Sequence, residues 1–222
     1  MNHITYQVIT TLKKTEKSMV MLAMMDGQDV PVIIKRMKAA NVEIYRALSK
    51  VNNVHIPHIY AMEFLEDELI IAEEYVDGET LEFYLNENSF DGEEKKLELM
   101  LQLCEAVKVL HNSTPQIIHR DIKPSNILIT EDGILKLIDF DASRQYKELS
   151  SDSDTRILGT VDYAAPEQFG YKQTDGRSDI YSMGIVFEKM DFRGKAMTVL
   201  AWRNIIDVLD LIQRKGTKTY KH

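Results

Sequence analysis

The chain has 222 residues, of which 44% are hydrophobic and 28% are charged, so it can bury a sizeable core in one domain or in two small lobes. Its 27 Lys and Arg against 35 Asp and Glu give a formal net charge of −8, which argues against nucleic acid as the main partner. A single cysteine, Cys104, excludes an internal disulfide and favours a reducing compartment. With no signal peptide and no apolar run of membrane-spanning length, we expect a cytoplasmic protein without a membrane partner.

The N-terminal third alternates short apolar segments with polar turns. This pattern predicts five strands, at residues 6–12, 19–25, 30–35, 62–65 and 69–72. Between the third and the fourth strand, Asn41 can cap a helix that runs through Val51, with Ile44 and Leu48 on its apolar side. A small antiparallel sheet with one helix is therefore expected at this end.

The middle of the chain predicts a longer helix, from about residue 93 to residue 112. Asp91, followed three residues later by Glu94, has the spacing of a capping box. We assign this helix to the core. His111 near its end is interpreted as a packed or solvated residue, and Cys104 as a small core residue.

Residues that can carry chemistry follow this helix. The segment 119–126 reads His-Arg-Asp-Ile-Lys-Pro-Ser-Asn and places a carboxylate, an ammonium group and an amide close together, at Asp121, Lys123 and Asn126. Asp121 can accept a proton from an incoming hydroxyl, and Lys123 is a cation for a phosphate.

Two short apolar strands, 127–129 and 134–138, surround an Asp-Gly turn that predicts a hairpin. If the turn is centred on residues 132 and 133, Asn126 falls opposite Asp139 at the open end. An amide oxygen beside a carboxylate suits Mg²⁺. A metal site, a proton acceptor and a cation together are the minimum apparatus for phosphoryl transfer.

These motifs resemble those of eukaryotic-type (Hanks-type) Ser/Thr protein kinases, and in particular those of bacterial members of that family. The segment 119–126 is similar to the catalytic loop of that family, and residues 139–141 (Asp-Phe-Asp) are similar to its metal-binding Asp-Phe-Gly motif. Residues 165–167 match its Ala-Pro-Glu motif. The likeness covers about residues 5–190 and fades beyond them.

The resemblance implies an α+β, two-lobed protein-kinase-like fold. Residues 1–74 would form an N-lobe of antiparallel sheet plus one helix, and residues 75–222 a mainly helical C-lobe, abbreviated at its C-terminus. The whole chain, residues 1–222, would be a single protein kinase domain with the nucleotide between the lobes. One further helix is expected at residues 196–214, and no convincing arginine partner for Glu167 can be placed.

The resemblance also implies how ATP would bind. Lys35, which ends the strand motif Val-Ile-Ile-Lys, would hold the α- and β-phosphates and pair with Glu43 of the helix. Backbone groups at Glu74 and Val76 would hydrogen-bond the adenine, while apolar side chains would cover its two faces. The residues expected to contact ATP are Val20, Lys35, Glu43, Glu74, Val76, Leu128 and Ile138.

The catalytic roles follow from the same resemblance. Asp121 would orient the hydroxyl of a protein substrate and accept its proton, and Lys123 would neutralise the transferred phosphoryl group. Asn126 and Asp139 would bind Mg²⁺. Thr160 would hydrogen-bond Asp121 and Lys123, an arrangement that favours Ser and Thr substrates over Tyr.

Three features depart from the family pattern. The phosphate-covering loop should carry glycine at Lys13, Thr15 and Ser18, and none is present. Either the lysines of this turn supply charge instead, or the turn is an ordinary solvated one. Ile33 stands where Ala is usual, and Asp141 replaces a glycine, where altered switching is expected more than lost metal binding.

Several residues are expected to support the site. Glu73, at the back of the nucleotide pocket, would need a partner if buried. His119 would pack under the catalytic loop, and Asp179 would accept hydrogen bonds from the loop's N–H groups. Residues 143–160 are expected to be a mobile surface loop, an activation segment open to autophosphorylation, or both. Arg120, next to the catalytic base, suggests that a phosphate on this segment controls activity, because arginine binds phosphate through two hydrogen bonds. The clustered hydroxyls are those of Ser150, Ser151, Ser153 and Thr155.

The leading interpretation is an ATP- and Mg²⁺-dependent Ser/Thr protein kinase with Asp121 as catalytic base. The alternative is a pseudokinase that acts as a nucleotide-binding or regulatory interaction module, as the missing glycines and the unusual Ile33 and Asp141 would allow. A small-molecule kinase fits poorly, because Thr160 and residues 165–167 resemble peptide-substrate machinery. Phosphate transfer, and not nucleotide binding, separates the first two interpretations.

Overall fold

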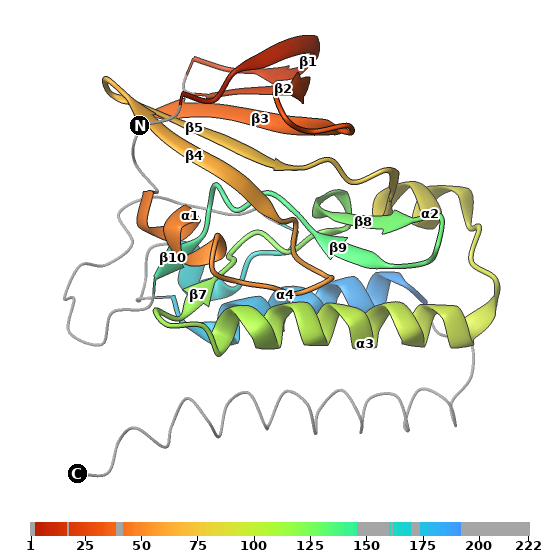
Figure 1. Cartoon of the computed structure of the whole chain (residues 1–222). Coiled ribbons are helices and arrows are strands. Elements are labelled where there is room, and N and C mark those ends of the chain that lie inside the picture. The colour runs from red at the N-terminus through yellow and green to blue at the C-terminus, as the bar shows by residue number, and fades with distance from the viewer. Residues whose placement is uncertain are drawn as a thin grey trace, which may run out of the picture.

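The structure, a computed structural model, places an antiparallel sheet above a mainly helical part (Figure 1). The residues it describes are 3–16, 18–38, 42–145, 160, 162–169 and 174–191. Most of the segment 143–160, including its four clustered hydroxyls, lies outside them. So do Lys17, Asn41 and the helix expected at residues 196–214.

The upper part is a five-stranded sheet in the order β1-β2-β3-β5-β4, with every neighbouring pair antiparallel. Its strands are β1 (Tyr6–Lys14), β2 (Ser18–Met25), β3 (Pro31–Lys38), β4 (Ile59–Leu65) and β5 (Glu68–Glu74). All five strands expected from the apolar pattern are confirmed. The alternation of side chains along β2 and β3 buries Met21, Ala23, Val32 and Ile34 on one face.

The helix α1 (Val42–Leu48) follows β3 and is shorter than the predicted helix through Val51. Backbone hydrogen bonds continue one turn past it, from Lys50 to Ala47 and from Val51 to Leu48, before the chain leaves the helical path. Four of its seven residues are buried, and it lies next to β10 (Arg144–Gln145). A helix this short is marginally stable alone, so its stability comes from the packing of its buried side.

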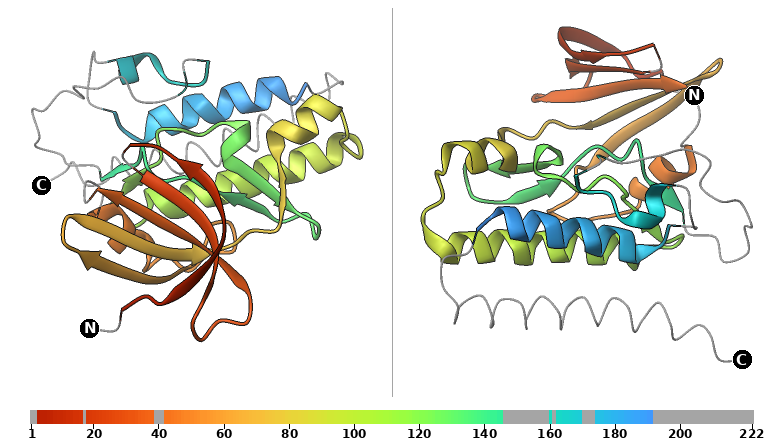
Figure 2. Two further views of the ribbon diagram at one scale, coloured as in Figure 1. Left: turned by 90° about the horizontal axis from the view of Figure 1, so that it is seen from above. Right: turned by 180° about the vertical axis from the view of Figure 1, so that it is seen from behind.

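The lower part contains the two longest helices of the described residues, α3 (Gly92–His111) and α4 (Gly176–Lys189), which run side by side (Figure 2). Its other elements are β6 (Gly78–Thr80), α2 (Leu81–Glu87), β7 (Ile117–Ile118), β8 (Ile127–Thr130), β9 (Leu135–Leu137) and 3₁₀ turns at Pro124–Asn126 and Pro166–Phe169. The predicted α+β, two-lobed fold is confirmed. Within the described part of the chain, no helix has both the length and the apolarity needed to cross a bilayer.

Two local predictions about the lower part are wrong. Asp91 precedes α3 without a side-chain capping bond, because the helix begins at Gly92, whose φ of +88° turns the backbone away from the capping-box geometry. In the hairpin, β8 pairs Ile127 with Leu137, so Asn126 lies opposite Ile138 and not opposite Asp139. The connection is a three-residue loop that ends at Gly133 with φ +77°, which shifts the register by one residue.

One large core joins the helices to the underside of the sheet. It includes Leu103 and Val107 of α3, Met183 of α4, and Leu69 and Ile71 of β5. Cys104 belongs to it, and burial raises the pKa of its thiol to about 12, which makes it an inert core residue as expected.

Candidate active site

Three polar side chains surround the carboxylate of Asp121 in the catalytic loop. Asp121 Oδ1 accepts hydrogen bonds from the backbone N and Oγ1 of Thr160, at 3.2 and 3.1 Å. Asp121 Oδ2 accepts from Asn126 Nδ2 at 3.0 Å and pairs with Lys123 Nζ at 2.8 Å. Lys123 Nζ also donates to Thr160 Oγ1 at 2.8 Å, so the predicted contacts of Thr160 with Asp121 and Lys123 are both confirmed.

A buried carboxylate holds the backbone of this loop. Asp179, at the start of α4, accepts hydrogen bonds from the backbone N–H groups of His119 and Arg120, at 2.9 and 2.8 Å, as predicted. It also accepts from His111 Nε2 at 2.8 Å, a contact that the sequence did not indicate. Burial opposes the charge of Asp179, but the hydrogen bonds from His111 and from the loop backbone hold its pKa below the usual value.

Two further contacts tie the loop to its surroundings. Arg120 has a φ of +70°, and its carbonyl accepts a hydrogen bond from Gln168 Nε2 at 2.7 Å. Gln168 Oε1 in turn accepts from the backbone N–H of Ala165 at 3.0 Å. Gln168 thereby connects the Ala-Pro-Glu turn with the catalytic loop, a role that no pattern in the sequence pointed to.

His119 has a structural position. It is fully buried, its ring lies 4.9 Å from the ring of Phe140, and its Nε2 donates to the carbonyl of Ile138 at 3.2 Å. Its Nδ1 accepts from the backbone N–H of Asp121 at 3.3 Å. Burial lowers its pKa, so the ring is neutral and fully engaged, which fits the predicted packing role and not a base.

Asn126 and Asp139 both lie at the open end of the β8–β9 hairpin, where Asn126 is opposite Ile138, the residue before Asp139. Asn126 is held by two bonds from its Nδ2 to Asp121, so its amide oxygen is directed away from that residue, and its carbonyl accepts from Ile138 N–H at 2.9 Å. Asp139, with φ +66°, is the next residue and lines the adjoining cavity. Within the described residues, no cluster of three His, Cys, Asp or Glu side chains forms a metal cage. An amide and a carboxylate oxygen beside a phosphate site are what Mg²⁺ uses with nucleotides, so the donors fit that ion.

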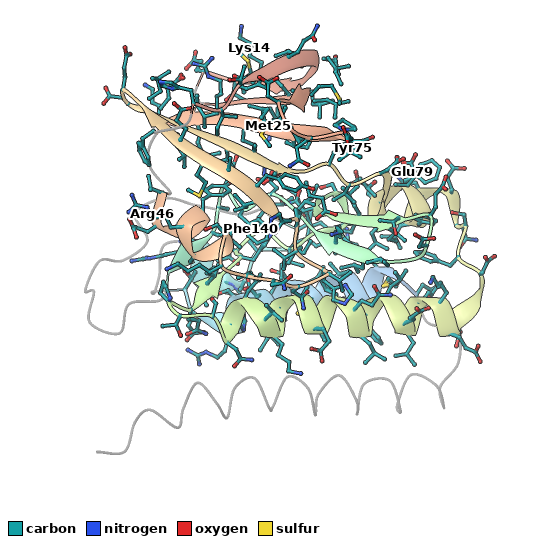
Figure 3. The ribbon with its side chains drawn as sticks, in the orientation of Figure 1. Lys14, Met25, Arg46, Tyr75, Glu79 and Phe140 are labelled. Carbon is teal, nitrogen blue, oxygen red and sulfur yellow. The ribbon has the colours of Figure 1, made fainter. Side chains whose placement is uncertain are left out.

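A cavity of about 340 Å³ lies between the sheet and the hairpin, a volume typical of a small-ligand site. It is lined by most of the residues expected to contact ATP, namely Val20, Lys35, Glu74, Val76, Leu128 and Ile138. Pro57 also lines it and was missed, because an isolated residue in a loop gives no periodic signal. Tyr75 and Gly78 line it as well, next to the predicted adenine contacts at Glu74 and Val76. Tyr75 lies on the connection that follows β5 (Figure 3).

The glycine-free turn between β1 and β2 closes on itself. The backbone N–H of Thr15 donates to the carbonyl of Ser18 at 2.8 Å, and the N–H of Ser18 donates to Thr15 Oγ1 at 3.0 Å. These side-chain bonds support a tight turn at positions where the family has glycine. Lys13 lines the cavity, so one lysine of the turn lies where it can face a phosphate.

The predicted ion pair between Lys35 and Glu43 is wrong. Lys35 Nζ lies 2.8 Å from Glu73 Oε1, and both residues are 6% exposed. Glu43 instead pairs with Arg46 at 2.7 Å, and 67% of the Glu43 side chain is exposed. Arg46 lies on the outer side of α1 (Figure 3). The apolar side of α1 is buried, which turns Glu43 toward solvent. The expectation that a buried Glu73 would need a partner is confirmed.

The carboxylates near Lys35 raise the pKa of its ammonium group. Burial alone would lower its pKa, but the carboxylates of Glu73, Asp141 and Asp139 raise it above the usual lysine value. Burial raises the pKa of Glu73, and Lys35 offsets only part of that change.

Tyr45 was missed by the sequence interpretation. It is fully buried on α1, and its hydroxyl donates to Asp141 Oδ1 at 2.7 Å. Asp141 therefore joins the helix to the segment that follows β9. Burial, together with Asp141 and Glu73, raises the pKa of the Tyr45 phenol well above its usual value, so the group stays a donor.

The connection after β5 is anchored through Glu74. Its carboxylate contacts Lys136 Nζ of β9 at 2.7 and 2.8 Å and accepts from the backbone N–H of His58 at 3.0 Å. Its own N–H donates to the carbonyl of His58 at 2.8 Å. The backbone from Glu74 to Val76, where the adenine edge is expected, thus rests on a fixed support.

Comparison with known proteins gives a consistent result. Residues 6–217 match the protein kinase domain family, so the match extends past residue 190, where the motif resemblance was expected to fade. The chain is 32% identical to the probable serine/threonine-protein kinase PknB of Bifidobacterium longum, over 82% of the chain and 30% of that protein. It is 33% identical to the serine/threonine-protein kinase PrkC of Bacillus subtilis, over 72% of the chain and 25% of that protein. A probable serine/threonine-protein kinase of Clostridium acetobutylicum is 30% identical over 84% of the chain and 27% of its own length. The chain thus spans less than a third of the length of these relatives.

Proposed function

Because the chain belongs to the eukaryotic-type family of Ser/Thr protein kinases, we propose that it transfers the γ-phosphate of ATP to serine or threonine hydroxyls of proteins. The observation that supports this most strongly is the Asp121 carboxylate, which Lys123, Asn126 and Thr160 fix beside the hairpin whose end lines the nucleotide cavity.

In the proposed reaction, Asp121 orients the substrate hydroxyl and accepts its proton as the new bond between oxygen and the γ-phosphorus forms. The bond between the γ-phosphorus and the oxygen shared with the β-phosphate breaks, and ADP leaves with that electron pair. Lys123, 2.8 Å from Asp121, balances negative charge on the transferred group. The four contacts to the carboxylate reduce its freedom to rotate away from the hydroxyl.

Asn126 and Asp139 would hold Mg²⁺, and Lys35 would bind the α- and β-phosphates. When bound, Mg²⁺ would neutralise charge on the phosphate oxygens. Val20, Leu128 and Ile138, which line the cavity, would enclose the adenine between apolar surfaces, and the backbone at Glu74 and Val76 would bind its edge.

The preference for Ser and Thr rests on Thr160, which contacts both Asp121 and Lys123 and so borders the place of the acceptor hydroxyl. ATP and a protein with an accessible hydroxyl are the proposed partners, and autophosphorylation within residues 143–160 is included. A single kinase domain over residues 1–222, with lobes 1–74 and 75–222, is part of the same proposal.

Intact mass spectrometry after incubation with ATP and Mg²⁺ tests the function. The chain is incubated alone and with a generic basic protein, and Asp121→Asn is run alongside. We expect phosphate to be added to either protein, at a rate about 10²- to 10⁴-fold lower in the variant, the usual contribution of a general base. Asp132→Asn changes an exposed aspartate of the β8–β9 turn and serves as the matched control.

Two outcomes would contradict the proposal. The first is equal transfer by Asp121→Asn and the wild-type chain. The second is a folded chain that binds nucleotide yet transfers no phosphate with Mg²⁺ or Mn²⁺, which would indicate a regulatory or nucleotide-binding module.

A further inference from the structure

The counter-ion of Lys35 lies on the sheet and not on the helix. The register of β3 and β5 pairs Ile33 with Glu73 and Lys35 with Ile71. Because side chains alternate along a strand, Lys35 and Glu73 are diagonal neighbours on the same face. Both strands have partners on each side, so the ladder of backbone hydrogen bonds holds the two side chains together. The 2.8 Å contact is therefore a product of the sheet itself.

Tyr45 occupies the side of α1 that faces Lys35 and Asp141. Its ring centroid lies 5.9 Å from Lys35 Nζ, and its hydroxyl donates to Asp141. Residues two positions apart in an α-helix point about 200° apart, so Glu43 and Tyr45 cannot both face Lys35. Glu43 lies accordingly on the outer side, paired with Arg46.

Replacing Glu73 by Glu43 as the partner of Lys35 would be unfavourable for two reasons. Turning α1 until Glu43 faces inward would expose the fully buried ring of Tyr45 and break its bond to Asp141. It would also free Glu73 from Lys35, and a buried carboxylate without a partner is costly. The arrangement seen here keeps both groups satisfied.

We propose that Glu73 is the positioning residue of Lys35: its carboxylate, supplied by the back wall of the nucleotide cavity, holds the ammonium group where the α- and β-phosphates bind, and Glu43 has no part in the site. This inference rests on the proposed function, because it gives Glu73 a role in positioning Lys35 for the phosphates of ATP. Lys35 is then held by the sheet, and its position does not depend on how α1 is placed.

The kinetic test compares Glu73→Gln with Glu43→Gln. Glu68→Gln is the matched control, because Glu68 lies on the same strand and pairs with Arg36 at a more exposed position. We expect Glu73→Gln to lower kcat/KM for ATP about tenfold, with KM for the protein substrate unchanged, since only phosphate positioning is lost. Glu73→Asp, which keeps the carboxylate, should recover part of the loss. A loss in Glu43→Gln with none in Glu73→Gln would overturn the assignment.

A stability measurement tests the same pair without relying on activity. Lys35→Met and Glu73→Met each leave one buried charge unpaired, and the double variant removes both. We expect the urea midpoint to fall in each single variant and to recover in the double, with no recovery when Lys35→Met is combined with Glu43→Met. If the chain transfers no phosphate, the proposed function fails while this comparison still reports the counter-ion. No recovery in Lys35→Met/Glu73→Met, or recovery with Glu43→Met, would overturn the inference.

Discussion

The catalytic loop and the Lys35 site differ in what fixes their functional groups. In the loop, Asp121, Lys123 and Asn126 are close in sequence, and one buried residue, Asp179, anchors the backbone that carries them. At the Lys35 site, the groups come from β3, β5, α1 and the segment after β9, and no single residue holds them all. Residues of a short contiguous motif therefore have relative positions that the local backbone determines. In a site assembled from distant elements, the tertiary packing determines which side chains become partners.

This difference has a consequence for how each region tolerates change. Two successive backbone N–H groups of the loop depend on one buried carboxylate, so losing that carboxylate should be severe. The Lys35 site spreads its support over Glu73, Tyr45 and Asp141, so losing one hydrogen bond there should have a smaller effect.

The largest effect is expected from Asp179→Asn. The amide cannot accept all three hydrogen bonds that Asp179 receives from His111, His119 and Arg120, so at least one buried N–H group loses its partner. We expect the free energy of unfolding to fall by about 3 kcal/mol, measured by urea denaturation at pH 7. Asp175→Asn, at the N-cap of the same helix, is the control and should change it by a few tenths of a kcal/mol, because Asn caps about as well as Asp.

The same variant has a defined dependence on pH. The folded-state pKa of Asp179 is depressed below the 3.8 of an unperturbed aspartate, so its stabilising contribution is fully present above pH 3.8 and is lost as the pH falls through the folded-state pKa. The difference in unfolding free energy between the wild-type chain and Asp179→Asn should therefore shrink on acidification below about pH 4. A difference that stays constant or widens would contradict Asp179 as the anchor.

A smaller effect is expected from Tyr45→Phe. This change removes the hydrogen bond to Asp141, whose other side meets solvent, so we expect a loss of about 1 kcal/mol. Amide hydrogen exchange should become faster in α1 and stay unchanged in α3 and α4. Tyr181→Phe, at an exposed tyrosine of α4, provides the control. A double-mutant cycle with Asp141→Asn should show a coupling of similar size, and a coupling of zero would show that the bond does not stabilise the helix.

Features that depend on local pattern were predictable from the sequence. The five strands and α3 followed from periodicity, whereas the contacts of Thr160 followed from the resemblance to the kinase family. The hairpin register was missed because Gly133 closes a three-residue loop, which the sequence does not distinguish from a two-residue one. The partner of Lys35 was missed for a different reason: a family motif names Glu43, but the burial of Tyr45 turns that residue outward.

The most direct test of this contrast is a crystal structure of the full chain with Mg²⁺ and a non-hydrolysable ATP analogue. We expect Lys35 Nζ to remain in ion-pair contact with Glu73 while it binds the phosphates, and Tyr45 to stay buried with its hydroxyl bonded to Asp141. A structure in which α1 has turned, Glu43 pairs with Lys35 and Tyr45 is exposed would contradict this expectation.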